Sequence, residues 1–179
     1  MTYLALLRGI NVGGNNIIKM ADLRECFEQM SFDDVRTYIQ SGNVLFDIPK
    51  TKPETLEVKI EKALKKRFGY NGIVVVISDK ELEAIVNEVP KGFGAKPEKY
   101  RCDVLFLKRP MKAVTAAKEI TLNEKIDTMH VGKHAIYFSR LADKASTSRL
   151  SKLASQPIYQ HITIRNWNTT SKLLAMIKK

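Results

Sequence analysis

The chain has 179 residues, of which 44% are apolar and 27% are charged, a composition typical of one globular domain or of two small ones. No apolar run approaches the roughly 20 residues that span a bilayer, and the first residues lack the pattern of a signal peptide. We therefore expect a cytoplasmic protein without a membrane segment, in which the two cysteines, Cys26 and Cys102, are reduced and buried.

Positive charge is concentrated in the second half of the chain. Residues 1–90 have a net charge of −1 and residues 91–179 a net charge of +12, so the total of +11 arises entirely beyond residue 90. Such asymmetry indicates a polyanionic partner, and RNA binding through the basic second half is one hypothesis. The lysines are dispersed rather than clustered, however, which favours the alternative that they only promote solubility.

In chain order, the first part of the sequence predicts strand, helix, strand, strand, helix and strand. Apolar residues recur every three or four positions between Met20 and Met30, which indicates an amphipathic helix. Alternating residues on both sides of the turn at 41–43 indicate a hairpin, and Ser78 with Glu81 forms the capping box of a further helix. We expect strands at 3–7, 35–39, 44–46 and 73–77, and helices at 20–30, 56–68 and 78–89.

The same order of elements follows a stretch rich in Gly, Pro and Lys at 90–100, which we expect to be a linker. A closing helix near the C-terminal end should begin with Asn168 or Thr169 as its N-cap. We expect strands at 102–107, 125–131, 134–139 and 161–164, and the other helices at 111–120 and 144–155.

A β-α-β-β-α-β order with both helices on one face of an antiparallel sheet is the ferredoxin-like arrangement. The sequence therefore predicts an α+β protein made of two tandem ferredoxin-like subdomains. We place the first subdomain with its connecting helix at 1–89, the linker at 90–100 and the basic second subdomain with the closing helix at 101–179.

A polar loop follows the first predicted strand in the stretch LLRGINVGGNNIIKM, residues 6–20. In the ferredoxin-like topology, this loop, the hairpin turn and the loop before the fourth strand emerge at one end of the sheet. Glycine amides, an arginine fork and asparagine side chains together suit a phosphate or another polar group. We expect a small polar ligand at residues 8–19 and 40–43, bound by Arg8, Gly9, Asn11, Gly13, Gly14, Asn15, Lys19, Gln40, Ser41, Gly42 and Asn43.

An alternative for this loop is a tight turn, since Gly and Asn both tolerate positive φ. That alternative accounts for Gly13, Gly14 and Asn15 but not for Arg8 at the end of a strand. The spacing also fails the P-loop motif, because Asn15 and Asn16 stand where Lys and Ser or Thr are required.

The loops expected to meet at this end of the sheet do not indicate catalysis. They contain no His, Asp, Glu or Cys, so no general acid or base is evident. An enzyme that uses Arg8 and Lys19 on a phosphoryl or acyl substrate stays a third hypothesis. Asp127, His130 and His134 lie around a hairpin turn rather than on a helix, so we expect neither a metal site nor a cofactor.

Three motifs resemble one known family: LLRGINVGG at 6–14, YIQSGNVLF at 38–46 and TIRNWNT at 163–169. The family is the bacterial domain-of-unknown-function (DUF) family 1697, and the resemblance covers essentially the whole chain. It implies two α+β subdomains, the first ferredoxin-like, and carries no activity. It adds Arg165, Asn166, Trp167 and Asn168 to the candidate binding residues, although a lone tryptophan at a strand–helix corner more often anchors a helix than stacks on a ligand.

Overall fold

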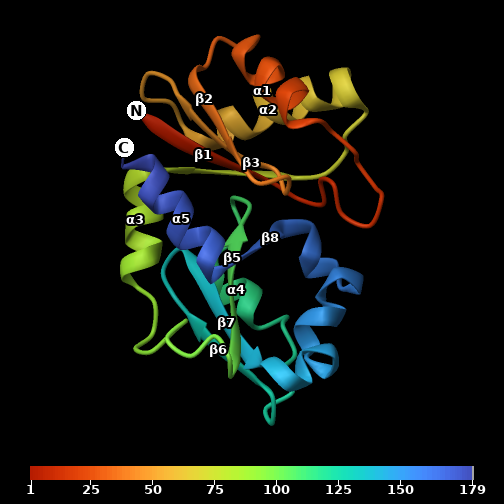
Figure 1. The fold of residues 1–179 in the computed structure, drawn as a ribbon, viewed down its shortest axis with the longest axis vertical. Coiled ribbons are helices and arrows are strands. Elements are labelled where there is room, and N and C mark those ends of the chain that lie inside the picture. Colours follow the sequence, from red (N-terminus) through yellow and green to blue (C-terminus); the bar gives the residue numbers. More distant parts are fainter. Residues whose placement is uncertain (179) are drawn as a thin grey trace. The chain divides into compact units, whose positions relative to one another are not determined.

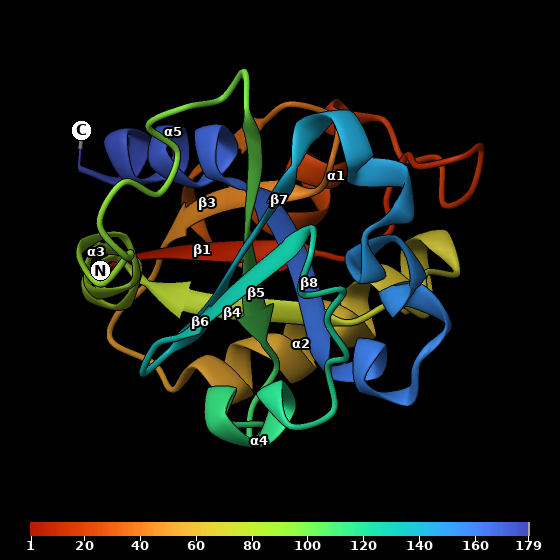
Figure 2. The same cartoon turned by 90° about the horizontal axis from the view of Figure 1, so that it is seen from below.

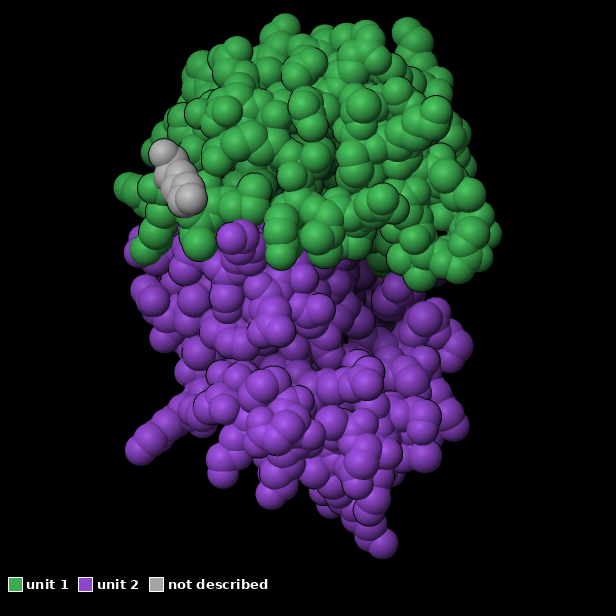
Figure 3. Space-filling view, viewed as in Figure 1, with its two compact units in different colours: residues 1–82, 175–179 green, residues 83–174 purple. Residues whose placement is uncertain are grey.

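The computed structural model describes residues 1–178. The chain divides into two compact units, residues 1–82 with 175–179 and residues 83–174 (Figure 3). Each unit contains one four-stranded sheet in which every neighbouring pair of strands is antiparallel. The predicted α+β class is therefore confirmed.

The first unit has the strand order β2-β3-β1-β4, which is the ferredoxin-like order. Its helices both cover the same face of the sheet (Figure 1). The elements are β1 (Thr2–Leu7), α1 (Met20–Glu28), β2 (Asp33–Tyr38), β3 (Asn43–Asp47), α2 (Pro53–Phe68) and β4 (Val74–Ser78).

Strand alternation and helix periodicity together build the core of the first unit. Every second residue of β1, β3 and β4 faces the helices, and these residues meet apolar side chains spaced by three and four positions on α1 and α2. Pro53 opens α2, and Gly69, in the left-handed conformation at φ +66°, closes it as the sequence predicts. The buried set includes Tyr3, Ala5, Leu7, Leu23, Phe27, Val44, Phe46, Leu56, Ile60, Leu64, Val74 and Val76.

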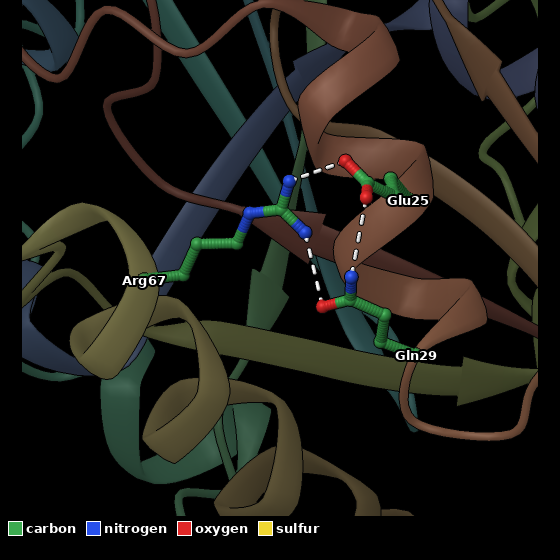
Figure 4. A network of polar contacts seen from close by, with 3 residues as sticks. All are labelled: Glu25, Gln29 and Arg67. Atoms are coloured by element: carbon green, nitrogen blue, oxygen red, sulfur yellow. Dashed lines mark hydrogen bonds and ion pairs between the residues drawn. The ribbon is translucent and has the colours of Figure 1, made fainter.

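A polar network joins the outer sides of α1 and α2 (Figure 4). Arg67 donates from Nη1 to Gln29 at 3.1 Å and pairs through Nη2 with Glu25, while Gln29 donates to Glu25 at 3.2 Å. These side chains are partly exposed, so solvent screens the pair and its role is mainly to orient the helices. Cys26 lies beneath it, and burial raises the pKa of its thiol, which is typical of an inert core cysteine.

The second unit repeats the strand order as β6-β7-β5-β8 (Figure 2). The hydrogen bond from the N–H of Glu81 to Ser78 Oγ, at 3.3 Å, confirms the predicted start of α3 (Asp79–Asn87), which leads toward this sheet. The remaining elements are β5 (Tyr100–Leu107), α4 (Ala113–Ala117), β6 (Asp127–Val131), β7 (Ala135–Leu141), three 3-10 helices at Ala142–Thr147, Arg149–Ser155 and Pro157–His161, β8 (Ile162–Asn166) and α5 (Trp167–Ile177).

The predicted helix at 144–155 is wrong, because successive 3-10 helices occupy this stretch. Its serines bond to the backbone locally, as when Ser151 Oγ donates to the carbonyl of Ser148 at 2.6 Å, and such bonds compete with helical ones. The buried carboxylate of Asp127 also holds the stretch, accepting hydrogen bonds from Ser148 Oγ and from the N–H of Arg149. Leu150 and Leu153, which suggested a helix, are buried against the second core together with α4.

One further difference concerns another helix of the second unit. The helix expected at 111–120 forms only over Ala113–Ala117. Within the described part of the chain, no helix has the length and apolar character needed to cross a membrane.

Candidate functional site

Three loops of the first unit meet at one end of its sheet. The N–H of Leu7 donates to the carbonyl of Gly42 at 2.8 Å, and the N–H of Arg8 donates to that of Ile73 at 3.1 Å. The Tyr70 hydroxyl donates to the carbonyl of Arg8 at 2.7 Å. The segments 8–19, 39–43 and 69–73, here called the rim, are therefore neighbours, as the topology predicts.

Asn11 fixes two of these segments to each other. Its Oδ1 accepts the N–H of Ile18 at 2.8 Å, and its Nδ2 donates to the carbonyls of Ile18 at 3.0 Å and Gln40 at 2.9 Å. An asparagine side chain offers two donors and one oxygen with two lone pairs, so most of this capacity is used inside the protein. Asn11 consequently positions the rim and leaves little of its side chain to meet a ligand.

Two other asparagines have the same structural role. Asn16 Nδ2 donates to the carbonyl of Gly9 at 3.0 Å. Asn43 is fully buried, and its Nδ2 donates to the carbonyl of Tyr38 and to Ser41 Oγ, each at 3.0 Å. Asn43 thus holds the turn that carries Ser41, and it acts on any ligand only by positioning its neighbours.

The glycines of the rim divide into two kinds. A side chain at Gly42 would place its Cβ 2.9 Å from that of Leu7, so this glycine permits a close approach within the scaffold. At Gly9, Gly13 and Gly14 a Cβ would meet nothing within 4 Å. Among the hydrogen bonds of residues 1–178, none has the N–H of Gly9, Gly13 or Gly14 as its donor.

The outer part of the rim is a tight turn. The N–H of Asn15 donates to the carbonyl of Val12 at 3.1 Å, which closes residues 12–15 into a β-turn around Gly13 and Gly14. In a β-turn the N–H groups of the two central residues make no hydrogen bond within the turn. The tight turn is therefore consistent with the unbonded N–H groups of Gly13 and Gly14.

Backbone strain is also located on the rim. Ile39 has φ +48°, a left-handed conformation that is unusual for a β-branched residue, and its side chain is 50% exposed. Such strain persists where surrounding contacts impose it and is frequent at functional sites.

Val12 and Ile17 are likewise 60% and 76% exposed, so apolar side chains stand beside the polar loop. Arg8 is half-buried at the end of β1, and Lys19 is exposed.

The third motif, at 163–169, lies in the second unit and is largely structural. Arg165 is buried and donates through Nη1 to Thr163 Oγ1 at 3.0 Å and to the carbonyl of Ile164 at 2.8 Å. The N-cap of α5 is Asn166, whose Oδ1 accepts the N–H of Thr169 at 2.7 Å, so the predicted cap at Asn168 or Thr169 is wrong.

Trp167 packs against the loop that precedes β5. Its ring meets that of Phe93 edge to face, with centroids 5.4 Å apart. It also lies so close to Gly94 that an added Cβ would be 2.2 Å from its Cδ1. Trp167 therefore anchors the start of α5, and it also lines a hollow of about 310 Å³ together with Asn166 and Asn168.

The charged residues of that hollow were not found from the sequence. Arg101, Asp103 and Arg140 contribute to its wall from β5 and β7. Their signal is a charged residue within a strand that is otherwise apolar, which is unusual because burying a charge without a partner is costly. Across residues 1–178, no group of three or more His, Cys, Asp or Glu side chains is placed to hold a metal ion.

Comparison with known proteins agrees with the motifs. The model of the family described as "Protein of unknown function (DUF1697)" matches residues 1–137, which include the whole rim. The solved structure of the conserved bacterial protein SP0830 from Streptococcus pneumoniae is similar over 98% of this chain and 98% of that one, with 28% identity and a TM-score of 0.82. Among curated proteins, none matches the chain.

Proposed function

The chain belongs to the DUF1697 family of proteins of unknown function, and we propose that its rim binds a small molecule that carries a phosphate or a similar anionic group. The observation that carries this proposal is the set of unbonded N–H groups at Gly9, Gly13 and Gly14, each with open space around its Cα. Unbonded amides in a loop that also carries positive side chains, here Arg8 and Lys19, form an anion-accepting surface.

Each part of the rim has a separate role in this proposal. Arg8 provides the positive charge and the planar fork that suits two oxygens of one phosphate, and Lys19 adds a second charge at the start of α1. The amides of Gly13 and Gly14 contact the remaining oxygens. Gln40 and Ser41 orient the rest of the ligand, on a turn that Asn43 holds in place.

The exposed apolar residues narrow the kind of ligand further. Ile17 and Ile39 are the chain neighbours of Ile18 and Gln40, whose carbonyls accept from Asn11, so both belong to the rim. A ligand with an anionic end and a flat or apolar body would contact both kinds of group. Inorganic phosphate and a nucleoside monophosphate therefore make a suitable pair of probes.

The test is isothermal titration calorimetry with these two probes. Removing one charge-assisted contact costs about 1.5–3 kcal/mol, so Arg8→Ala should weaken binding by about tenfold or more. Arg24→Ala is the matched control, because Arg24 is an exposed arginine of the same unit on α1. Lys19→Ala tests the same site with a side chain at the surface.

The proposal predicts that Arg8→Ala and Lys19→Ala both weaken the nucleoside monophosphate while Arg24→Ala does not. Absence of measurable binding by either probe to the unaltered protein would contradict it. Equal weakening by Arg8→Ala and Arg24→Ala would mean that the probes respond only to the overall charge.

A further inference from the structure

A hollow in the second unit is lined by charged and polar side chains. Its volume of about 310 Å³ is at the lower end of the range for small-molecule pockets. Five of its lining side chains come from the ends of β5 and β7 and from the start of α5. They are Arg101, Asp103, Arg140, Trp167 and Asn168.

Strand register brings two positive charges together at this hollow. Arg101 of β5 is directly opposite Arg140 of β7, and Asp103 is opposite Asn166 of β8. Residues directly opposite in an antiparallel pair have their side chains on the same face, and like charges there repel. The unusual placement of two arginines therefore needs a negative charge to offset it.

Asp103 offsets this repulsion only partly. Its Oδ2 is 3.3 Å from Arg140 Nη2, but the two groups are not aligned as a hydrogen bond, and Arg140 Nε has no acceptor. Asp103 is 8% exposed, and burial raises the pKa of its carboxyl against the lowering effect of Arg140 and Arg101. Asp103 and Arg140 are thus mostly buried and only partly paired, and the exposed Arg101 lies opposite Arg140 in the register.

The carboxylate on the other side of Arg140 is already engaged. Asp127 of β6 is opposite Arg140 in the register, yet its oxygens accept from Ser148 Oγ and from the N–H groups of Asn123 and Arg149. No ion pair joins Asp127 to Arg140 among the described residues. Asp103 is consequently the only carboxylate of residues 1–178 that lines the hollow with the two arginines.

The remaining lining suits a ligand with an acidic group and an apolar body. The Asn168 side chain is exposed and makes no hydrogen bond within residues 1–178, so its amide offers both donors and an acceptor. The indole of Trp167, fixed by Phe93 and Gly94, supplies an apolar wall.

We propose that this hollow binds a small molecule through one carboxylate or phosphate group held between Arg101 and Arg140, with Asn168 bonded to the same group and Trp167 against its apolar part. All residues of this site belong to the second unit, whereas the rim belongs to the first. Arginine forks are well matched to both acid groups, and the two are distinguished by experiment.

The test uses the emission of Trp167, which is the only tryptophan of the chain and lies in the wall of the hollow. The full-length protein is titrated with phenyl phosphate and, separately, with benzoate. Arg101→Ala and Asn168→Ala remove exposed side chains, so neither is expected to prevent folding. Arg149→Ala is the matched control, because Arg149 is an exposed arginine of the same unit outside the hollow.

We expect a saturable change in emission with at least one probe, and the probe that binds more tightly identifies the acid group. Arg101→Ala should weaken that binding about tenfold, whereas Arg149→Ala should change it by less than about twofold. The same titration should be unaffected by Arg8→Ala, which separates this site from the rim. Absence of saturation with both probes, or equal weakening by Arg101→Ala and Arg149→Ala, would overturn the proposal.

Discussion

The contact between Gly94 and Trp167 gives a sharp prediction about the second unit. Gly94 has φ +77°, and a Cβ added there would lie 2.2 Å from Trp167 Cδ1 and 2.5 Å from its Nε1. Gly92, two residues earlier, has φ +81°, but a Cβ there would meet nothing within 4 Å. Gly92→Ala and Gly94→Ala therefore share the backbone strain and differ in the clash with the indole.

The expected magnitudes follow from these two terms. A left-handed conformation costs an L-residue about 1–2 kcal/mol, and both variants should lose this much free energy of unfolding. Overpacking adds about 1–3 kcal/mol for Gly94→Ala alone. For a chain of this length, each kcal/mol lowers the Tm by about 2–4 °C, so Gly94→Ala should melt roughly 2–12 °C below Gly92→Ala.

The assay is thermal unfolding followed by circular dichroism, repeated in a Trp167→Ala background. Because that background removes the clashing ring, Gly94→Ala should then cost no more than Gly92→Ala. Equal Tm values for the two glycine variants in the unaltered background would refute the packing of Trp167 on Gly94, and with it the wall of the proposed pocket.

Two further predictions concern single polar side chains. Asn11→Gly keeps the left-handed backbone but removes three hydrogen bonds, each worth about 0.5–1.5 kcal/mol, so urea unfolding should show a loss of about 1.5–4.5 kcal/mol. Asn15→Gly, at an exposed position, should cost clearly less, and equal losses would disprove the role of Asn11. Because burial raises the pKa of Asp103, the folded state binds its proton more tightly, and this contribution to stability is lost as the pH rises above the ordinary value of 3.8. The stability of the unaltered protein relative to Asp103→Asn should therefore fall with rising pH in urea unfolding, and a relative stability that rises with pH would contradict the stated environment.

The sequence predicted best where a single period decides the structure. Apolar residues every three or four positions predict α1, and the continuous apolar runs at 3–7 and 44–46 match the fully buried strands β1 and β3. The order of elements then determines the ferredoxin-like pairing. It failed at 144–155, because Leu150 and Leu153 are three apart and this spacing fits an α-helix and a 3-10 helix equally well. The 3-10 conformation is supported by hydrogen bonds to the buried carboxylate of Asp127, which lies in β6 and not in this stretch.

Only those features of the two sites that follow from the order of the strands could be predicted from the sequence. The meeting of the rim loops follows from the order of the strands, but the bonds of Asn11 depend on Gln40, 29 residues away. The pair Arg101 and Arg140 depends on the register of β5 and β7, and a shift of one residue would place them on opposite faces. Neither the composition of the chain nor the spacing of its residues determines which residues of two strands lie opposite each other.

The most direct test of the rim as a binding site is an NMR titration of ¹⁵N-labelled protein with inorganic phosphate. Glycine amides are well separated in such spectra, so Gly9, Gly13 and Gly14 report on their own N–H groups. If the rim binds an anion, saturable shifts are largest at these three amides and are lost in Arg8→Ala. Amide shifts confined to the second unit, or no saturable shift at all, would contradict the proposal that the rim binds an anion.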